Sequence, residues 1–136
     1  MESNTKTEKQ VIGALGEDIA SRYLENKGFS IVTRNYRKKF GEIDIVTKKK
    51  EKIHFVEVKT VSREADAVVT QETPDGFRAE DNVHDWKLKR LSRAIRVYLS
   101  ENKIPDESEW QFDVITVMLD TKSKIAKVRF LEDIIL

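Results

Sequence analysis

Apolar residues recur along the chain at two spacings, and each spacing predicts a type of secondary structure. Residues 8–27 and residues 83–102 carry apolar side chains every three to four positions, which is the spacing of one face of an α-helix. The predicted stripe of the first segment consists of Val11, Ile12, Leu15, Ile19 and Tyr23. The predicted stripe of the second consists of Leu88, Leu91, Ile95, Tyr98 and Leu99. Both segments are therefore predicted to be helices that pack against a core with one face.

Five other segments are rich in β-branched and aromatic residues, which favours β-strands. They span residues 29–37, 42–48, 53–61, 110–119 and 124–130. Short turns at Phe40-Gly41 and at residues 49–52 join the first three, which predicts an antiparallel meander. The order αβββαββ predicts the α/β class, with a mixed sheet flanked by helices in a single domain over residues 1–136. Residues 1–7 are expected to be a flexible N-terminus.

Charge is unevenly distributed, although 25 Lys and Arg against 24 Asp and Glu leave a net charge of only +1. Residues 34–52 hold eight bases and three acids, and residues 86–96 hold five bases and no acid. Between these basic blocks, residues 64–82 hold six acids and one base. Residues 62–82 follow neither apolar spacing, so we expect a long acidic loop between the two blocks.

Several classes of protein are excluded by what the chain lacks. It has no cysteine, which excludes disulfides and every sulfur-ligated metal site. Its two histidines, His54 and His84, have no partner at metal-ligand spacing. No uncharged run is long enough to span a membrane, and the N-terminal residues lack the apolar stretch of a secretory signal. We therefore expect a soluble cytoplasmic protein without a membrane partner.

Three charged residues interrupt strands that are otherwise apolar. Strict alternation places Glu42, Asp44 and Val46 on one face of their strand, and Glu57 and Lys59 on one face of the next. One interpretation is a salt bridge between Asp44 and Lys59 at an edge of the sheet. The other is a Mg²⁺ site formed by Asp44, Glu57 and the carbonyl group between Glu57 and Lys59.

A further acid, Asp113, also lies inside an apolar strand. We expect a structural role for it, accepting a hydrogen bond from a backbone amide or from an arginine.

The first predicted helix contains two glycines, Gly13 and Gly16, close to Glu17 at the margin of its apolar stripe. Each glycine costs a helix about 1 kcal/mol relative to alanine. That cost is understandable if the helix approaches the sheet closely and carries Glu17 to its edge. The alternative is looser packing with Glu17 in solvent.

Basic residues gather on the second predicted helix, opposite its apolar stripe or at the border of that stripe. They are Lys87, Lys89, Arg90, Arg93 and Arg96. Such a face is either solvated surface or a surface that binds phosphate groups. The first basic block extends it with Arg34, Arg37 and Lys38. Aromatic residues are sparse among these bases, so base stacking is not the expected binding mode.

A series of motifs follows this order along the chain: Gly13-x-x-Gly16-Glu17, Tyr23-Leu24, Gly28-Phe29, Arg34-Asn35, Gly41-Glu42-Ile43-Asp44, Phe55-Val56-Glu57-Val58-Lys59, Lys87, Tyr98-Leu99 and Phe112-Asp113-Val114-Ile115. Over residues 11–118 the series resembles the YraN family of bacteria. That family is similar to the restriction-endonuclease-like PD-(D/E)XK nucleases and, within them, to archaeal Holliday-junction resolvases.

The resemblance implies a restriction-endonuclease-like core and a metal-dependent endonuclease that acts on DNA, structured or branched. Asp44 and Glu57 would hold Mg²⁺ or Mn²⁺ together with the Val58 carbonyl. Glu17 would bind metal through water or complete a second site. Lys59 would orient the attacking water or stabilise charge on the phosphate, and Lys87 would reach the scissile phosphate. The similarity to resolvases also implies a homodimer.

Two other functions remain open at this point. One is a nucleic-acid-binding module that keeps the fold and the basic helix without cleaving. The other is a protein-interaction domain whose acidic loop docks a basic partner. The YraN family usually carries a basic, glycine-containing stretch after the strand that contains Glu57 and Lys59. This chain instead has Val61-Ser62-Arg63 followed by the acidic loop.

Overall fold

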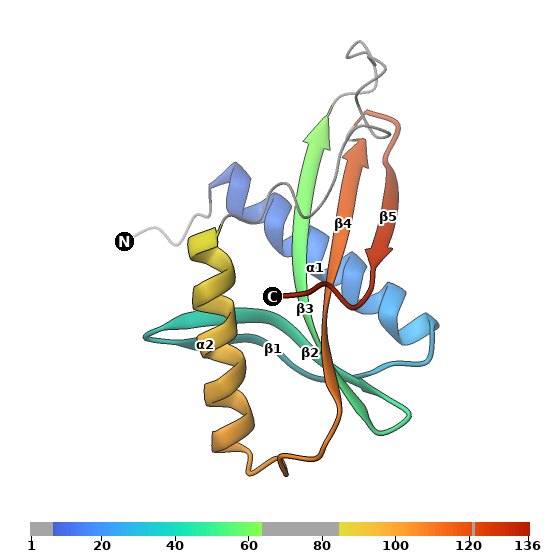
Figure 1. The fold of residues 1–136 in the computed structure, drawn as a ribbon. Coiled ribbons are helices and arrows are strands. Elements are labelled where there is room, and N and C mark those ends of the chain that lie inside the picture. The colour runs from blue at the N-terminus through green and yellow to red at the C-terminus, as the bar shows by residue number, and fades with distance from the viewer. Residues whose placement is uncertain (1–6, 64–84, 121) are drawn as a thin grey trace, which may run out of the picture.

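The computed structural model describes residues 7–63, 85–120 and 122–136 (Figure 1). Its elements are α1 (Glu8–Asn26), β1 (Ser30–Lys38), β2 (Gly41–Lys49), β3 (Lys52–Arg63), α2 (Asp85–Glu101), β4 (Trp110–Asp120) and β5 (Ile125–Leu131). The predicted order αβββαββ is confirmed. Within the described residues, no helix is long and apolar enough to cross a membrane.

The five strands form one sheet in the order β1-β2-β3-β4-β5. β2 is antiparallel to both β1 and β3, which confirms the predicted meander. β4 runs parallel to β3, and β5 is antiparallel to β4, so the sheet is mixed. In Figure 1, α1 passes behind the sheet and α2 lies in front of it. This is the α/β class of the prediction, and the arrangement is consistent with a restriction-endonuclease-like core.

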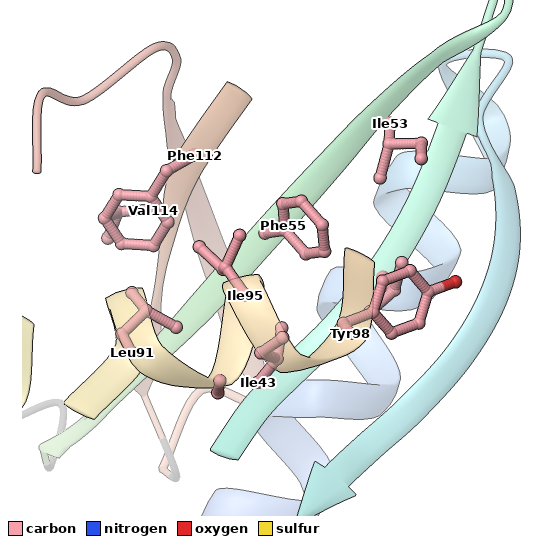
Figure 2. Packing of buried hydrophobic residues seen from close by; sticks show 10 residues of the cluster. Ile43, Ile53, Phe55, Leu91, Ile95, Tyr98, Phe112 and Val114 are labelled. Atoms are coloured by element: carbon pink, nitrogen blue, oxygen red, sulfur yellow. The ribbon is translucent and has the colours of Figure 1, made fainter. Parts of the chain in front are cut away.

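Each helix closes one apolar cluster. Leu91, Ile95 and Tyr98 of α2 pack with Phe55 and Phe112 of the sheet (Figure 2). On the other face, α1 packs with a second cluster, formed by Ala20, Leu24, Ile45, Val56, Ile115 and neighbouring residues. The predicted stripe of α2 is confirmed, since Leu88 and Leu99 also pack against the first cluster.

The predicted stripe of α1 is wrong in part. Val11 and Leu15 are 51% and 47% exposed. The buried residues of this helix are the smaller Gly16, Ala20 and Ser21, together with Leu24. Small residues face the sheet because the helix backbone lies very close to it, and the larger Ile12, Ile19 and Tyr23 pack at the side.

Gly16 is the point of closest approach. A Cβ atom placed there would overlap the side chain of Thr60 on β3, so the predicted reason for this glycine is confirmed. The same reason is wrong for Gly13, where an added Cβ would meet no atom within 4 Å.

β2 parts from β3 at Asp44. The pairing between these strands runs from Lys49 and Lys52 to Ile45 and Val56, and then ends. Beyond this point β2 stays paired with β1, and β3 stays paired with β4 to its last residue. Figure 1 shows the β1–β2 hairpin turning away from β3.

The alternation of side chains along β2 also breaks at this point. Ile43 and Val46 both belong to the α2 cluster, whereas Ile45 belongs to the α1 cluster. The predicted shared face of Glu42, Asp44 and Val46 is therefore wrong. β1 is irregular at the same level, because Asn35 has a φ angle of 55°.

The remaining differences concern the ends of elements. Thr7 was predicted to belong to a flexible N-terminus, but it caps α1 in a reciprocal capping box with Gln10. Ser62 and Arg63 were predicted to be loop, but they belong to β3. The acidic residues 64–82 and residues 83 and 84 of the second predicted helix lie outside the described residues.

Candidate functional site

A cavity of about 510 Å³ opens where β2 parts from β3. Residues of α1, β2, β3 and α2 line it. Among them are all five residues to which the resemblance assigned a catalytic role: Glu17, Asp44, Glu57, Lys59 and Lys87. The fold thus brings these residues together at one place.

Asp44 takes over a hydrogen bond that strand pairing has given up. The Val58 N–H donates to its Oδ2 atom at 2.8 Å. Because the β2–β3 ladder ends at Ile45 and Val56, the carboxylate replaces a backbone acceptor for this N–H. The bond also fixes the direction of the Asp44 side chain in the cavity.

The surroundings of Asp44 disfavour its charged form. Part of its surface remains accessible, but protein atoms surround it on most sides. This burial and the adjacent Glu57 carboxylate raise the pKa of Asp44 well above its usual range, and Glu17 adds to the shift. The Val58 hydrogen bond and the Lys87 ammonium group oppose the shift without cancelling it.

Glu57 is nearly inaccessible, with 4% of its surface exposed, and it is paired with Lys87 from α2. Burial disfavours the charged ammonium group of Lys87. The carboxylates of Glu57, Asp44 and Glu42 outweigh this effect, so the pKa of Lys87 lies above its ordinary value. Lys87 is therefore a cation at neutral pH, and it pairs with Glu57, which is a candidate metal ligand.

Glu17 is held from outside the cavity by Arg34 of β1. One guanidinium nitrogen lies 3.6 Å from Glu17 Oε1, and the other lies 2.9 Å from Asp18 Oδ1. Arg34 was predicted to bind nucleic acid, whereas here it anchors the acids of α1. The Arg34-Asn35 motif was the only sequence signal for this role.

Lys59 lines the cavity beside the carboxylates. In the described part of the chain it forms no ion pair with Asp44, whose carboxylate binds the Val58 N–H instead. The salt-bridge interpretation of these two residues is therefore not supported.

The donor set at Asp44 and Glu57 fits a hard divalent cation. Carboxylate oxygens are the ligands that Mg²⁺ and Mn²⁺ prefer. Burial and the repulsion from Glu57 raise the pKa of Asp44, and a bound cation would relieve that repulsion. Among the residues that the structure describes, no three His, Cys, Asp or Glu side chains gather closely enough to hold a metal. An ion at this pair would therefore complete its shell with main-chain, water or phosphate oxygens, as Mg²⁺ commonly does.

The predicted nucleic-acid-binding residues fall into two groups. Those of β1 are paired with acids: Arg34 as described, Arg37 with Glu42 at 3.0 Å, and Lys38 with Glu101 at 3.1 Å. Those of α2 beyond Lys87 are exposed and have no acidic partner within the described ranges: Lys89, Arg90 and Arg93.

Asp113 lies away from the cavity and has the structural role that was predicted. Its carboxylate is fully buried and accepts a hydrogen bond from the Asp133 N–H at 2.8 Å. His54 Nδ1 lies 2.7 Å from its other oxygen. The sequence did not predict this partner, because the two residues lie on different strands.

Comparison with known proteins identifies the family. The uncharacterised protein family UPF0102 matches residues 16–117. A UPF0102 protein of Alkaliphilus oremlandii is 42% identical over 113 residues, which cover 82% of this chain and 87% of the relative. One of Campylobacter jejuni strain 81-176 is 36% identical over 108 residues, covering 79% and 84%. One of Campylobacter fetus is 31% identical over 124 residues, covering 91% and 93%. The chain therefore belongs to the UPF0102 family, which is the YraN family that its motifs resemble.

Proposed function

We propose that this protein is a metal-dependent endonuclease that hydrolyses phosphodiester bonds of DNA. The observation that carries the proposal is the convergence of two carboxylates, a third acid and two lysines around one cavity at the parting of β2 and β3. Acids that hold a hard cation and lysines that bind phosphate are the groups that phosphodiester hydrolysis requires. The proposal keeps the cytoplasmic setting that the sequence suggests.

Each residue has a task that follows from its position. Asp44 and Glu57 would hold the divalent cation, which when bound supplies Lewis-acid activation of the phosphate and of a water molecule. The Val58 N–H keeps the Asp44 carboxylate in place for this purpose. Lys59 lines the same cavity, where its ammonium group would hold a phosphate oxygen or the attacking water.

Lys87 and Glu17 act from the two helices. In the free protein Lys87 neutralises Glu57. If Glu57 served as a metal ligand, the Lys87 ammonium group would be free to bind a phosphate oxygen. Glu17 would bind the cation through water, and Arg34 keeps its carboxylate at the cavity wall.

The exposed basic residues of α2 would hold the DNA backbone next to the cavity. Lys89, Arg90 and Arg93 lie on the helix that also carries Lys87, so phosphates bound there would lead a strand toward the carboxylates. A homodimer, implied by the similarity to resolvases, would place two such sites on one branched DNA.

A second candidate is a module that binds nucleic acid without cleaving it. Two observations favour it: Lys87 already occupies Glu57, and the described residues supply no third metal-ligating side chain. In that case the cavity would have no chemical role, and binding would depend on α2 alone.

Cleavage of labelled duplex, single-stranded and four-way-junction DNA tests both candidates. Each DNA is incubated with Mg²⁺ or Mn²⁺ and, in parallel, with EDTA. The variants are Lys59→Ala and Asp44→Asn, with Lys127→Ala on the exposed side of β5 as the matched control. The nuclease proposal expects metal-dependent cleavage that only the control retains. Binding without cleavage under every condition would overturn it in favour of the binding module.

A further inference from the structure

A second cavity, of about 540 Å³, lies on the far side of the β1–β2 turn from the carboxylates. It is lined by Phe40, Arg93, Arg96, Val97, Ser100 and Glu101. Phe40 is 52% exposed, which is unusual for a ring of this size. The cavity therefore combines an open aromatic ring with guanidinium groups.

The two cavities are neighbours along α2. Gly41 packs against the main chain of Arg90 so closely that an added Cβ would overlap the Arg90 carbonyl. On one side of this contact, Glu42 and Lys87 line the carboxylate cavity; on the other, Phe40 and Arg93 line the second cavity. At 1.5 Å per residue, Arg93 lies about 9 Å along the helix from Lys87. That distance corresponds to about three nucleotides of a helical strand.

The charge of the second cavity suits a phosphate group. Arg93 and Arg96 are exposed and have no acidic partner within the part of the chain that the structure describes. Glu101 is the one acid in the lining, and its carboxylate is already engaged. It accepts a hydrogen bond from the Tyr36 hydroxyl at 2.6 Å and pairs with Lys38 at 3.1 Å. The net charge that a ligand meets there is positive.

We propose that this cavity binds an unpaired nucleotide of the DNA strand, with its base on the ring of Phe40 and its phosphate on Arg93 and Arg96. An exposed aromatic ring beside arginines is the combination that holds single-stranded nucleic acid, because every base offers a flat face for stacking. The inference rests on the proposed function and names its substrate class. DNA with an unpaired segment a few nucleotides from the cleaved bond, such as a junction, flap or overhang, is the ligand.

The fold creates this combination from residues that are far apart in sequence. Aromatic residues are sparse within the basic blocks, so the sequence argued against stacking. The β1–β2 turn brings Phe40 to α2, where it lines one cavity with Arg93 and Arg96, more than 50 positions further along the chain.

Binding in EDTA tests the inference independently of cleavage. The probes are a blunt DNA duplex, the same duplex with a short single-stranded overhang, and the free single strand, each measured by fluorescence anisotropy. We expect Phe40→Ala to weaken binding of the overhang and the single strand about tenfold and to leave the blunt duplex unchanged. Phe40→Trp should keep the wild-type affinities. Ile125→Ala on β5, where the side chain is 56% exposed, is the matched control and should change nothing.

A fluorescent base at the first unpaired position adds a direct readout. Stacking on Phe40 should change the emission of 2-aminopurine there when wild type or Phe40→Trp binds, but not when Phe40→Ala binds. Equal losses on all three DNAs, or no loss with Phe40→Ala, would overturn the inference. A protein that binds with this Phe40 dependence but never cleaves with Mg²⁺ would overturn the nuclease proposal and leave the nucleotide site standing.

Discussion

Asp44 and Glu57 are adjacent carboxylates whose negative charges are only partly balanced by nearby positive charge. Lys87 pairs with Glu57, while Asp44 has a single hydrogen bond from the Val58 N–H. Burial and repulsion from Glu57 therefore raise the pKa of Asp44. Unfavourable electrostatics of this kind, at the wall of a cavity, are typical of sites where a bound ligand relieves the repulsion.

Replacing Asp44 by asparagine should therefore stabilise the protein at neutral pH. The native state favours the protonated form of Asp44, so it holds that proton to a higher pH than the unfolded chain does. The stabilisation from this proton is complete below the unfolded pKa, about 3.9, and is lost as the pH rises through the raised native pKa. As the pH rises above the unfolded pKa, the wild-type native state increasingly bears the cost of a buried carboxyl group beside Glu57, whereas Asp44→Asn has no group there to titrate. We expect a gain of about 1 kcal/mol in the free energy of unfolding, measured by urea denaturation.

Two comparisons make this prediction specific. The gain should shrink as the pH is lowered toward 4, and Asp106→Asn, an exposed site between α2 and β4, should show no gain at either pH. Under the proposed metal-binding role, Mg²⁺ should raise the thermal midpoint of wild type more than that of Asp44→Asn, because only the intact carboxylate pair would bind the ion tightly. A destabilised Asp44→Asn at pH 7 would contradict the argument.

At the scale of elements, the closeness of α1 to the sheet decides where Glu17 lies. Gly16 allows this approach by leaving room for Thr60 of β3, and Glu17 follows directly at the cavity wall. Gly13 also lines the cavity but has open space around it. The two glycines of one helix therefore have different roles.

Alanine substitutions should separate these roles. Gly13→Ala adds a methyl group that meets no atom within 4 Å, so it should stabilise the protein by about 0.5–1 kcal/mol through helix propensity. Gly16→Ala should destabilise it by about 1–3 kcal/mol, because the methyl group overlaps Thr60 and pushes α1 off the sheet. Urea denaturation measures both effects. Thr60→Ala combined with Gly16→Ala should recover part of the loss, and equal effects of the two glycine substitutions would refute this assignment.

The elements were predictable from the sequence where side-chain spacing alone decides burial. The stripe of α2 is such a case, because large residues such as Leu91 and Ile95 face the sheet. The buried face of α1 was not predictable in this way. It is formed by the small residues Gly16 and Ala20, whereas Val11 and Leu15 of the predicted apolar stripe are exposed.

The candidate site was predictable as a set of residues but not as a geometry. The motifs contained the five candidate catalytic residues among those that line the cavity, yet alternation along β2 fails at Asp44, where the strand leaves its partner. The pairing of Arg34 with Glu17 and the position of Phe40 against α2 depend on contacts between distant segments. No local pattern contains that information.

At the scale of the whole molecule, the basic residues do not form one uniform surface. The basic residues of β1 are neutralised by Asp18, Glu42 and Glu101, whereas those of α2 that follow Lys87 remain exposed to solvent. The long-range attraction for a polyanion is therefore concentrated on α2, although both blocks are equally basic in character along the sequence.

The salt dependence of DNA binding should reveal this difference. Under the proposed DNA-binding role of α2, Arg90→Ala or Arg93→Ala should each reduce the slope of log affinity against log salt concentration by about one, since each would remove one phosphate contact. Arg37→Ala should change the slope little, because its charge is already balanced by Glu42 at 3.0 Å. Anisotropy titrations of a duplex at several NaCl concentrations measure the slopes. An Arg37→Ala effect as large as that of Arg90→Ala would refute the division into two groups.

The parting of β2 from β3 also determines which part of the protein sets the shape of the cavity. From Asp44 back to its turn, the β1–β2 hairpin is not paired with β3. It contacts α2 instead, where Gly41 packs against Arg90 and the ring of Tyr36 lies 5.2 Å from that of Tyr98. The position of Asp44 relative to Glu57 therefore depends on the packing of α2 as well as on the Val58 hydrogen bond. Natural variation in the core of α2, at Ala94 or Tyr98, can retune the chemistry of the site over evolutionary time while every residue in the cavity stays the same.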